Sequence, residues 1–95
     1  MNNIELIETY LDNVKKTGVS DSVFLAYKND LDTLKDFLGE NSIILMSKSS
    51  IMDYINFLRD NFTNNTVVRK LNSFKNFYKI LAQEKKVDSG LLEDL

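Results

Sequence analysis

The chain has 95 residues, enough for one small domain with a modest core. Hydrophobic residues make up 43% of it and charged residues 27%, which is typical of an ordinary globular protein. It contains no Cys and no His. This absence excludes disulfides, thiolate nucleophiles, imidazole bases and the usual Cys or His metal ligands, so we expect no metal and no cofactor.

Targeting signals are also missing from the sequence. No apolar stretch approaches the length of a membrane-spanning helix, and the first residues show neither the basic nor the apolar segment of a secretory signal. We therefore expect a cytoplasmic protein with no membrane partner. The chain lacks Pro and has only three Gly, so few residues interrupt helices and an all-α fold is predicted.

Two helices are predicted in the first part of the chain, over residues 3–16 and 21–38. Gly18 is placed to end the first, Ser20 is a good N-cap for the second, and Gly39 is placed to end it. Apolar residues recur in both at helical spacing. The predicted buried stripes are Ile4, Ile7, Leu11 and Val14, with Leu6 and Tyr10 beside them, and Val23, Tyr27, Leu31, Leu34 and Leu38, with Phe24 and Phe37.

A connection is predicted over residues 40–47, followed by a third helix over residues 48–61. The apolar segment from Ile43 to Met46 has strand propensity, but no partner strand is predicted elsewhere. We therefore expect the connection to place Leu45 in the core. Ser47 is the predicted N-cap of the third helix. Its predicted buried residues are Ile51, Tyr54, Ile55 and Leu58.

The longest predicted helix covers residues 64–86, with Thr63 or Asn64 as its cap. The tail, residues 87–95, could form a final turn, but we expect it to lead out of the domain. Four helices with short connections predict a compact four-helix bundle that forms a single domain over residues 1–95. The predicted inner stripe of the longest helix is Val67, Leu71, Phe74, Tyr78 and Leu81.

Basic residues are concentrated in one part of the chain, although the net charge is only −2. Residues 1–47 carry eight acids and four bases, whereas residues 61–86 carry six bases and one acid. No carboxylate occurs from residue 61 to residue 83. A local basic segment in a mildly acidic chain indicates one surface that faces an anion.

The outward side of the longest helix combines amides, hydroxyls and bases without any acid. Such a face suits a major groove, because Arg recognises guanine and Asn or Gln recognises adenine, and Lys79 suits a phosphate. The same face would also serve as a plain solvated surface, and the helix alone leaves both interpretations equally open. The predicted outward residues are Asn65, Thr66, Arg69, Asn72, Ser73, Asn76, Lys79 and Gln83.

Two other functions are weighed against DNA binding. An independent enzyme is disfavoured, because the carboxylates lie mostly on polar helix faces and the chain has no Gly-rich phosphate loop and no Ser-centred elbow. A helical protein-interaction module without a nucleic-acid role is the alternative; the net negative charge favours it, and the acid-free stretch from residue 61 to residue 83 disfavours it.

Four motifs in a fixed order and spacing carry a family resemblance. They are IETYLDNVKKTGVS, SDSVFLAYKNDLDTLKDFL with its Ala-Tyr-basic-x-Asp-Leu run at residues 26–31, SKSSIMDYINFL, and NNTVVRKLNSFKNFYKILAQEKKV. Together they resemble the N-terminal, SAM-like core-binding domain of tyrosine recombinases and phage integrases, in particular the Xer-type group. The resemblance covers about residues 4–90.

The resemblance implies a DNA-binding module of a site-specific recombinase that is not an enzyme by itself. In that family the domain is one jaw of a clamp, and its second and fourth helices enter the major groove of a half-site. The catalytic Tyr and its Arg, His and Lys partners belong to a second domain, so residues 87–95 are expected to begin a linker to an absent catalytic domain. The implied partners are a double-stranded DNA half-site and other recombinase protomers in a synaptic complex, and the isolated domain is expected to be monomeric.

The resemblance also marks individual positions. It marks Lys28 and Asn29 on the second helix. On the fourth it marks Asn65, Thr66, Arg69 and Lys70; the helical wheel agrees for the first three and places Lys70 on the flank, as a phosphate contact. No catalytic role is implied for any tyrosine: Tyr27, Tyr54 and Tyr78 are interpreted as core. The complete predicted DNA-binding set is Lys28, Asn29, Asn65, Thr66, Arg69, Lys70, Ser73, Asn76 and Lys79.

Three positions depart from the family pattern with apolar side chains. Val23 stands where Thr or Ser is frequent, and Leu25 and Val68 stand where polar residues that face the groove are common. Val68 would suit a thymine methyl group. Gly90 and Leu91 replace the Asn-Pro pair that usually opens the linker.

Overall fold

The structure is a computed structural model that describes residues 2–92. Within that range it contains four α-helices, two short 3₁₀ helices and no strand, so the all-α prediction is confirmed. The predicted bounds of the first three helices are confirmed residue for residue. The elements are α1 (Asn3–Lys16), α2 (Asp21–Leu38), η1 (Ile43–Leu45), α3 (Lys48–Asn61), α4 (Asn64–Gln83) and η2 (Ser89–Leu92).

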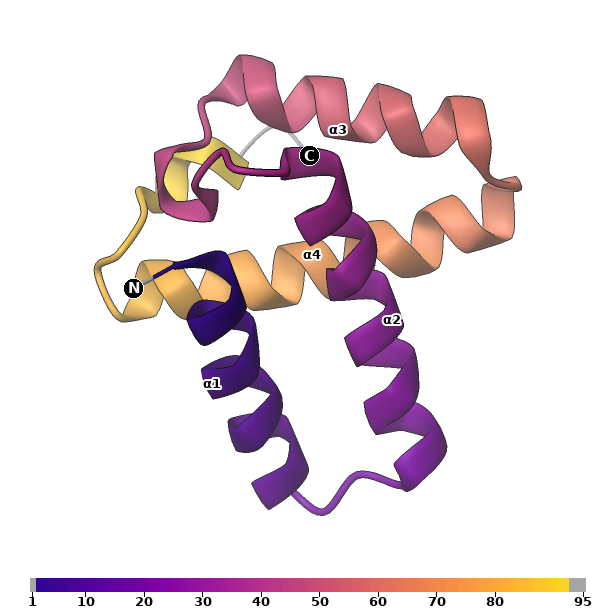
Figure 1. The fold of residues 1–95 in the computed structure, drawn as a ribbon, viewed down its shortest axis with the longest axis vertical. Coiled ribbons are helices and arrows are strands. Elements are labelled where there is room, and N and C mark those ends of the chain that lie inside the picture. Colours follow the sequence, from indigo (N-terminus) through magenta and orange to yellow (C-terminus); the bar gives the residue numbers. More distant parts are fainter. Residues whose placement is uncertain (1, 93–95) are drawn as a thin grey trace.

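The four helices form two antiparallel pairs that cross each other. In Figure 1, α1 and α2 lie side by side and both cross α4, while α3 runs back along α4. The core lies where the two pairs meet, and α4 contributes the largest share of its buried residues. Because α4 touches every other helix, its orientation determines which of its side chains reach the surface.

Local sequence signals explain where the helices begin. The Ser20 and Ser47 hydroxyls accept hydrogen bonds from the backbone N–H groups of Val23 and Ser50, at 3.3 and 3.1 Å. Both serines therefore cap their helices as predicted. Thr63 is the N-cap residue of α4, but its hydroxyl donates to the Thr66 hydroxyl at 3.1 Å instead of accepting from the backbone.

The end of α4 comes three residues before the predicted position. Lys85 adopts a positive φ of 60°, the backbone N–H of Lys85 donates to the Ala82 carbonyl, and that of Lys86 donates to the Leu81 carbonyl. These bonds form a Schellman motif, which usually has Gly at the left-handed position. A lysine there gives no composition signal, so the sequence predicted a longer helix.

The connection between α2 and α3 corrects one sequence prediction. Leu45 was expected in the core, but it is 80% exposed, whereas Ile43 and Met46 are buried. The cause is the 3₁₀ geometry of η1, which has three residues per turn and places positions 43 and 46 on one side and position 45 on another.

The tail after α4 folds back in its described part. The short helix η2 packs against α4, and Val87, Leu91 and Leu92 lie partly buried against the core. That residues 87–95 begin a linker stays a prediction, and residues 93–95 lie outside the described residues. No helix in the described part of the chain has the length and hydropathy needed to cross a membrane.

Candidate nucleic-acid interface

The solvent-facing side of α4 is polar, basic and free of acids. We call it the outer face of α4. Arg69 and Lys79 supply its positive charge, amides supply hydrogen-bonding groups, and Val68 is its apolar member, 58% exposed. This arrangement keeps most of the predicted groove-facing residues on the surface. The exposed members are Asn65, Val68, Arg69, Asn72, Asn76, Lys79 and Gln83.

A groove of about 480 Å³ runs along this face between α2 and α4. It brings together the two helices that the sequence predicted to contact DNA. Its α2 wall is mostly apolar, and its α4 wall carries one guanidinium, one hydroxyl and two amides. The lining residues are Val23, Ala26, Tyr27 and Asp30 from α2, and Arg69, Asn72, Ser73 and Asn76 from α4.

Asp30 is the single acid among the residues that line this groove, and its charge is enclosed by donors. Arg69 Nη2 donates to Asp30 Oδ1 at 2.9 Å, Lys70 Nζ donates to the same oxygen at 3.2 Å, and Ser73 Oγ donates to Oδ2 at 2.7 Å. The Asp30 side chain is only 1% exposed. One carboxylate of α2 therefore holds three neighbouring side chains of α4.

Two of the predicted DNA contacts, Lys70 and Ser73, are buried in the structure. Both were expected at or near the surface, but they are 3% and 5% exposed. Lys70 Nζ also donates to Thr33 Oγ1 at 2.9 Å and lies 5.1 Å from the centre of the Phe62 ring. A lysine is buried only where partners compensate its charge, and these groups provide that compensation. Both residues belong to the α2–α4 interface, where their polar groups bond to Asp30.

Asn76 and Thr66 keep part of their polar groups in internal bonds. The Asn76 side-chain amide donates to the Tyr10 hydroxyl at 2.9 Å, which ties α4 to α1. The pKa of Tyr10 is raised, first because burial disfavours the charged phenolate and second because Tyr27 lies close; the bond from Asn76 opposes this rise. Thr66 is half-buried and accepts from the Thr63 hydroxyl.

On α2, both predicted contacts, Lys28 and Asn29, are exposed. Lys28 is exposed and pairs with Asp32 one turn later, with 3.5 Å between Nζ and Oδ2. An exposed pair of this kind is weak, so Lys28 can exchange Asp32 for another anion. The Asn29 side chain is exposed, and its backbone carbonyl accepts from the Thr33 hydroxyl at 3.1 Å.

The three apolar departures from the family pattern are all exposed. Val23 lies in the groove and is 42% exposed, Leu25 lies on α2 at 59%, and Val68 lies on α4 at 58%. Sequence reasoning placed Val23 in the core, and the structure contradicts this. All three side chains therefore project from α2 or α4, the two helices that line the groove.

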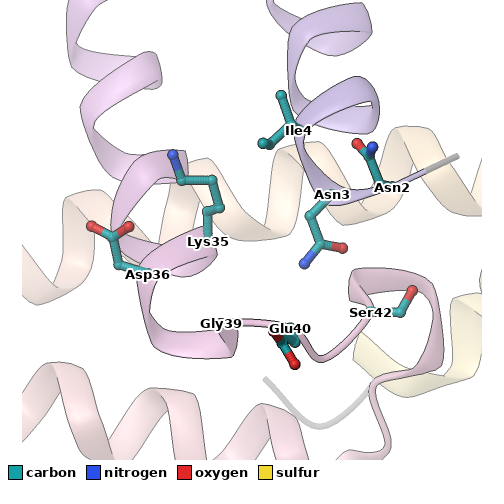
Figure 2. Close-up of a pocket in the computed structure, with 8 residues that line it drawn as sticks. All are labelled: Asn2, Asn3, Ile4, Lys35, Asp36, Gly39, Glu40 and Ser42. Carbon is teal, nitrogen blue, oxygen red and sulfur yellow. The ribbon is translucent and has the colours of Figure 1, made fainter.

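A second pocket lies at the other end of the α1–α2 pair (Figure 2). It combines Lys35 with Asp36 and Glu40, so its charges are mixed and do not favour a polyanion. The Asn3 side chain closes it on the loop side, because its amide donates to the Asn41 carbonyl and its oxygen accepts from the Ile43 N–H, both at 2.8 Å. The pocket therefore lies where hydrogen bonds from Asn3 connect α1 to the loop before α3.

Comparison with known proteins identifies the family of the chain. Residues 7–85 match the family described as "Phage integrase, N-terminal SAM-like domain". The chain is 32% identical over 85 residues to a protein named tyrosine recombinase XerC from Listeria innocua, and 31% identical to proteins of the same name from two strains of Listeria monocytogenes. No solved structure matches the chain.

These alignments cover 84–85% of this chain but only 28% of each relative. The chain therefore corresponds to a little over a quarter of the length of these recombinases. The family match spans most of the chain and includes α2, α4 and the groove between them. The chain belongs to the family of N-terminal SAM-like domains of phage integrases.

Proposed function

We propose that this chain is the DNA-binding module of a site-specific tyrosine recombinase or integrase. It grips one half-site by laying α2 and α4 into the major groove. By itself it is not an enzyme; it acts in the cytoplasm with other recombinase protomers in a synaptic complex, and it positions DNA for a catalytic domain joined beyond residue 95.

The observation that carries this proposal is the acid-free outer face of α4 beside the groove. A face evolved only for solubility usually alternates acids with bases, because i,i+4 pairs stabilise helices. Here Arg69 and Lys79 stand among exposed amides with no carboxylate on the helix. The one acid that lines the groove, Asp30, is buried and bonded to three donors. The balance of charged residues on this side therefore favours a polyanion.

Individual residues would then take separate roles. Arg69 reaches a guanine edge or a phosphate, Lys28 and Lys79 neutralise phosphates, and Asn65 with Asn76 and Asn29 supplies amides for base edges. Thr66, at the first turn of α4, offers its backbone N–H to a phosphate. The exposed apolar side chains Val23, Leu25 and Val68 suit thymine methyl groups.

The experiment is a salt series with a fluorescein-labelled duplex of mixed sequence, read by fluorescence anisotropy. If about four or five phosphates are neutralised, the logarithm of the binding constant falls against the logarithm of salt concentration with a slope of about −4. We expect affinity at about micromolar levels or weaker, because one jaw of a clamp lacks the avidity of two.

Arg69→Ala tests the assigned face, and Arg59→Ala is its matched control. Both arginines are exposed, but Arg59 lies in the last turn of α3, away from the groove. Arg69→Ala should weaken binding by about 1–3 kcal/mol if it contacts guanine, and Arg59→Ala should leave binding near the wild-type value. Salt-independent binding, or equal losses from the two variants, would contradict the proposal.

A further inference from the structure

An acid in the groove of a DNA-binding face calls for an explanation, because its charge repels phosphates. Asp30 lies in the wall of the groove between α2 and α4, yet its side chain is 1% exposed. Its oxygens accept bonds from Arg69, Lys70 and Ser73 at 2.9, 3.2 and 2.7 Å. The carboxylate is therefore directed at α4 and hidden from solvent.

The two cations bound to Asp30 have different surroundings. Lys70 is 3% exposed and has further contacts with Thr33 and Phe62, whereas the Arg69 side chain is 51% exposed. Lys70 thus balances the buried negative charge from within. The net charge of Asp30, Lys70 and Arg69 together is therefore +1. Because Arg69 is the exposed member, this positive charge faces the groove.

Arg69 remains free to bind a second group while it is held. A guanidinium has five N–H donors in a fixed plane, and Asp30 engages it through Nη2 alone. The other N–H groups are left for a base edge or a phosphate. An arginine already fixed in one orientation loses less side-chain entropy when it binds than one that rotates freely.

We infer that Asp30 is a positioning residue for the DNA contact of Arg69, with Lys70 neutralising the carboxylate so that it does not repel the backbone. This inference rests on the proposed function. Asp30 touches no nucleic acid in this arrangement; it acts through the orientation of Arg69.

The sign of one substitution separates positioning from simple electrostatics. Removal of an acid from a DNA-facing groove strengthens DNA binding if charge alone matters. If Asp30 positions Arg69, Asp30→Asn weakens binding of the mixed-sequence duplex by about two- to tenfold. Asp53→Asn, which removes one exposed acid from α3, is the matched control and leaves binding within the error of the wild type.

A double-mutant cycle shows whether Asp30 acts through Arg69. In an Arg69→Ala background, Asp30→Asn should no longer weaken binding, because the side chain it positions is gone. If Asp30→Asn weakens binding by the same factor in both backgrounds, or binds as tightly as the wild type or more tightly, the inference is overturned. A wild-type protein that binds no duplex overturns the proposed function instead, and is recognised before any variant is compared.

The cycle needs folded variants, and Asp30→Asn leaves the buried Lys70 charge poorly compensated. The Asp30→Asn, Lys70→Met double variant is therefore also compared with the wild type, because it removes both buried charges and strands neither. A readout without DNA completes the test: the guanidinium N–H signals of Arg69 in NMR spectra should be resolved in the wild type and averaged in Asp30→Asn. Signals averaged in both proteins would show that Asp30 does not restrain Arg69.

Discussion

The side-chain amide of Asn76 on α4 donates a hydrogen bond of 2.9 Å to the hydroxyl of Tyr10 on α1. The Tyr10 ring is buried, with its centre 5.1 Å from that of Phe77 and 6.4 Å from that of Tyr27. A residue of the outer face of α4 is thereby anchored to the first helix. The contact shows how the same helix serves both the core and the surface.

Tyr10→Phe should show how much of the stability contributed by Tyr10 comes from its hydrogen bond with Asn76 and how much from the packing of its ring. The variant keeps the ring in place and removes only the hydroxyl, so the free energy of unfolding should fall by about 1 kcal/mol. Tyr10→Ala also removes the ring and should lower it by about 3–5 kcal/mol. Urea denaturation followed by circular dichroism measures both, and equal losses would show that the ring contributes nothing beyond the hydroxyl.

Tyr54→Phe should stabilise the bundle. Tyr54 is fully buried, and its hydroxyl has no hydrogen-bond partner within the described part of the chain. Removal of an unpaired buried hydroxyl relieves a desolvation penalty of about 1–3 kcal/mol. Tyr78→Phe is the matched control, because the equally buried Tyr78 hydroxyl donates to the Ile43 carbonyl at 3.3 Å. Thermal melts should rise for the first variant and fall for the second; the reverse order would contradict the assignment.

Two lysines of α4 should respond in opposite ways to truncation. Lys70→Ala removes a buried partner of Asp30 and should lower the free energy of unfolding by about 3–5 kcal/mol. Lys79 is exposed, so Lys79→Ala should change stability by less than about 0.5 kcal/mol. It should instead reduce the salt slope of DNA binding by about 1. A stable Lys70→Ala protein, or an unchanged slope for Lys79→Ala, would count against these roles.

Alkaline pH should destabilise the fold through buried tyrosines. Burial raises the pKa of Tyr10, Tyr54 and Tyr78 above the ordinary value of 10.0. The folded chain therefore holds these phenolic protons more tightly than the unfolded chain, and the resulting stability is fully present below pH 10 and is lost as pH rises above it. Each group contributes about 1.4 kcal/mol per pH unit in that range.

The measurement is the urea midpoint from about pH 8 to about pH 11. We expect no loss from these tyrosines up to about pH 9 and a steep fall above pH 10. Tyr78→Phe should make the fall shallower, because one titrating group is removed. A urea midpoint as high at about pH 11 as at about pH 8 would contradict a role of these tyrosines in alkaline unfolding.

Sequence reasoning succeeded at most helix ends, where the signal is local, but helical periodicity wrongly placed Ile4 and Val23, which are 54% and 42% exposed, in the buried stripes. Ser20, Ser47, Gly18 and Gly39 mark helix ends through capping chemistry that involves only neighbouring residues. It failed at Lys85, where a lysine adopts the conformation that Gly usually takes. Both outcomes follow from the physics of helix ends, which depends on a few adjacent backbone groups.

The site was predicted less completely because its buried part depends on a contact between distant residues. A helical wheel treats Lys70 and Ser73 as polar and assigns them outward, and nothing within α4 reveals the carboxylate of Asp30 on α2. The available signal was Asp30 itself, because this acid directly precedes the buried Leu31 and stands among the apolar residues of the α2 stripe. The exposed polar members of the outer face needed no such information and were placed by periodicity alone, whereas Val68 was singled out only through the family resemblance.

The most direct test of the central claim is a titration of the ¹⁵N-labelled chain with duplex DNA, followed by NMR. The account predicts shifts on the exposed residues of α2 and α4, among them Asn29, Asn65, Arg69 and Lys79, that shrink as salt is raised. Shifts confined to α1, or no shifts with duplex at about millimolar concentration, would contradict it and favour a protein-interaction module.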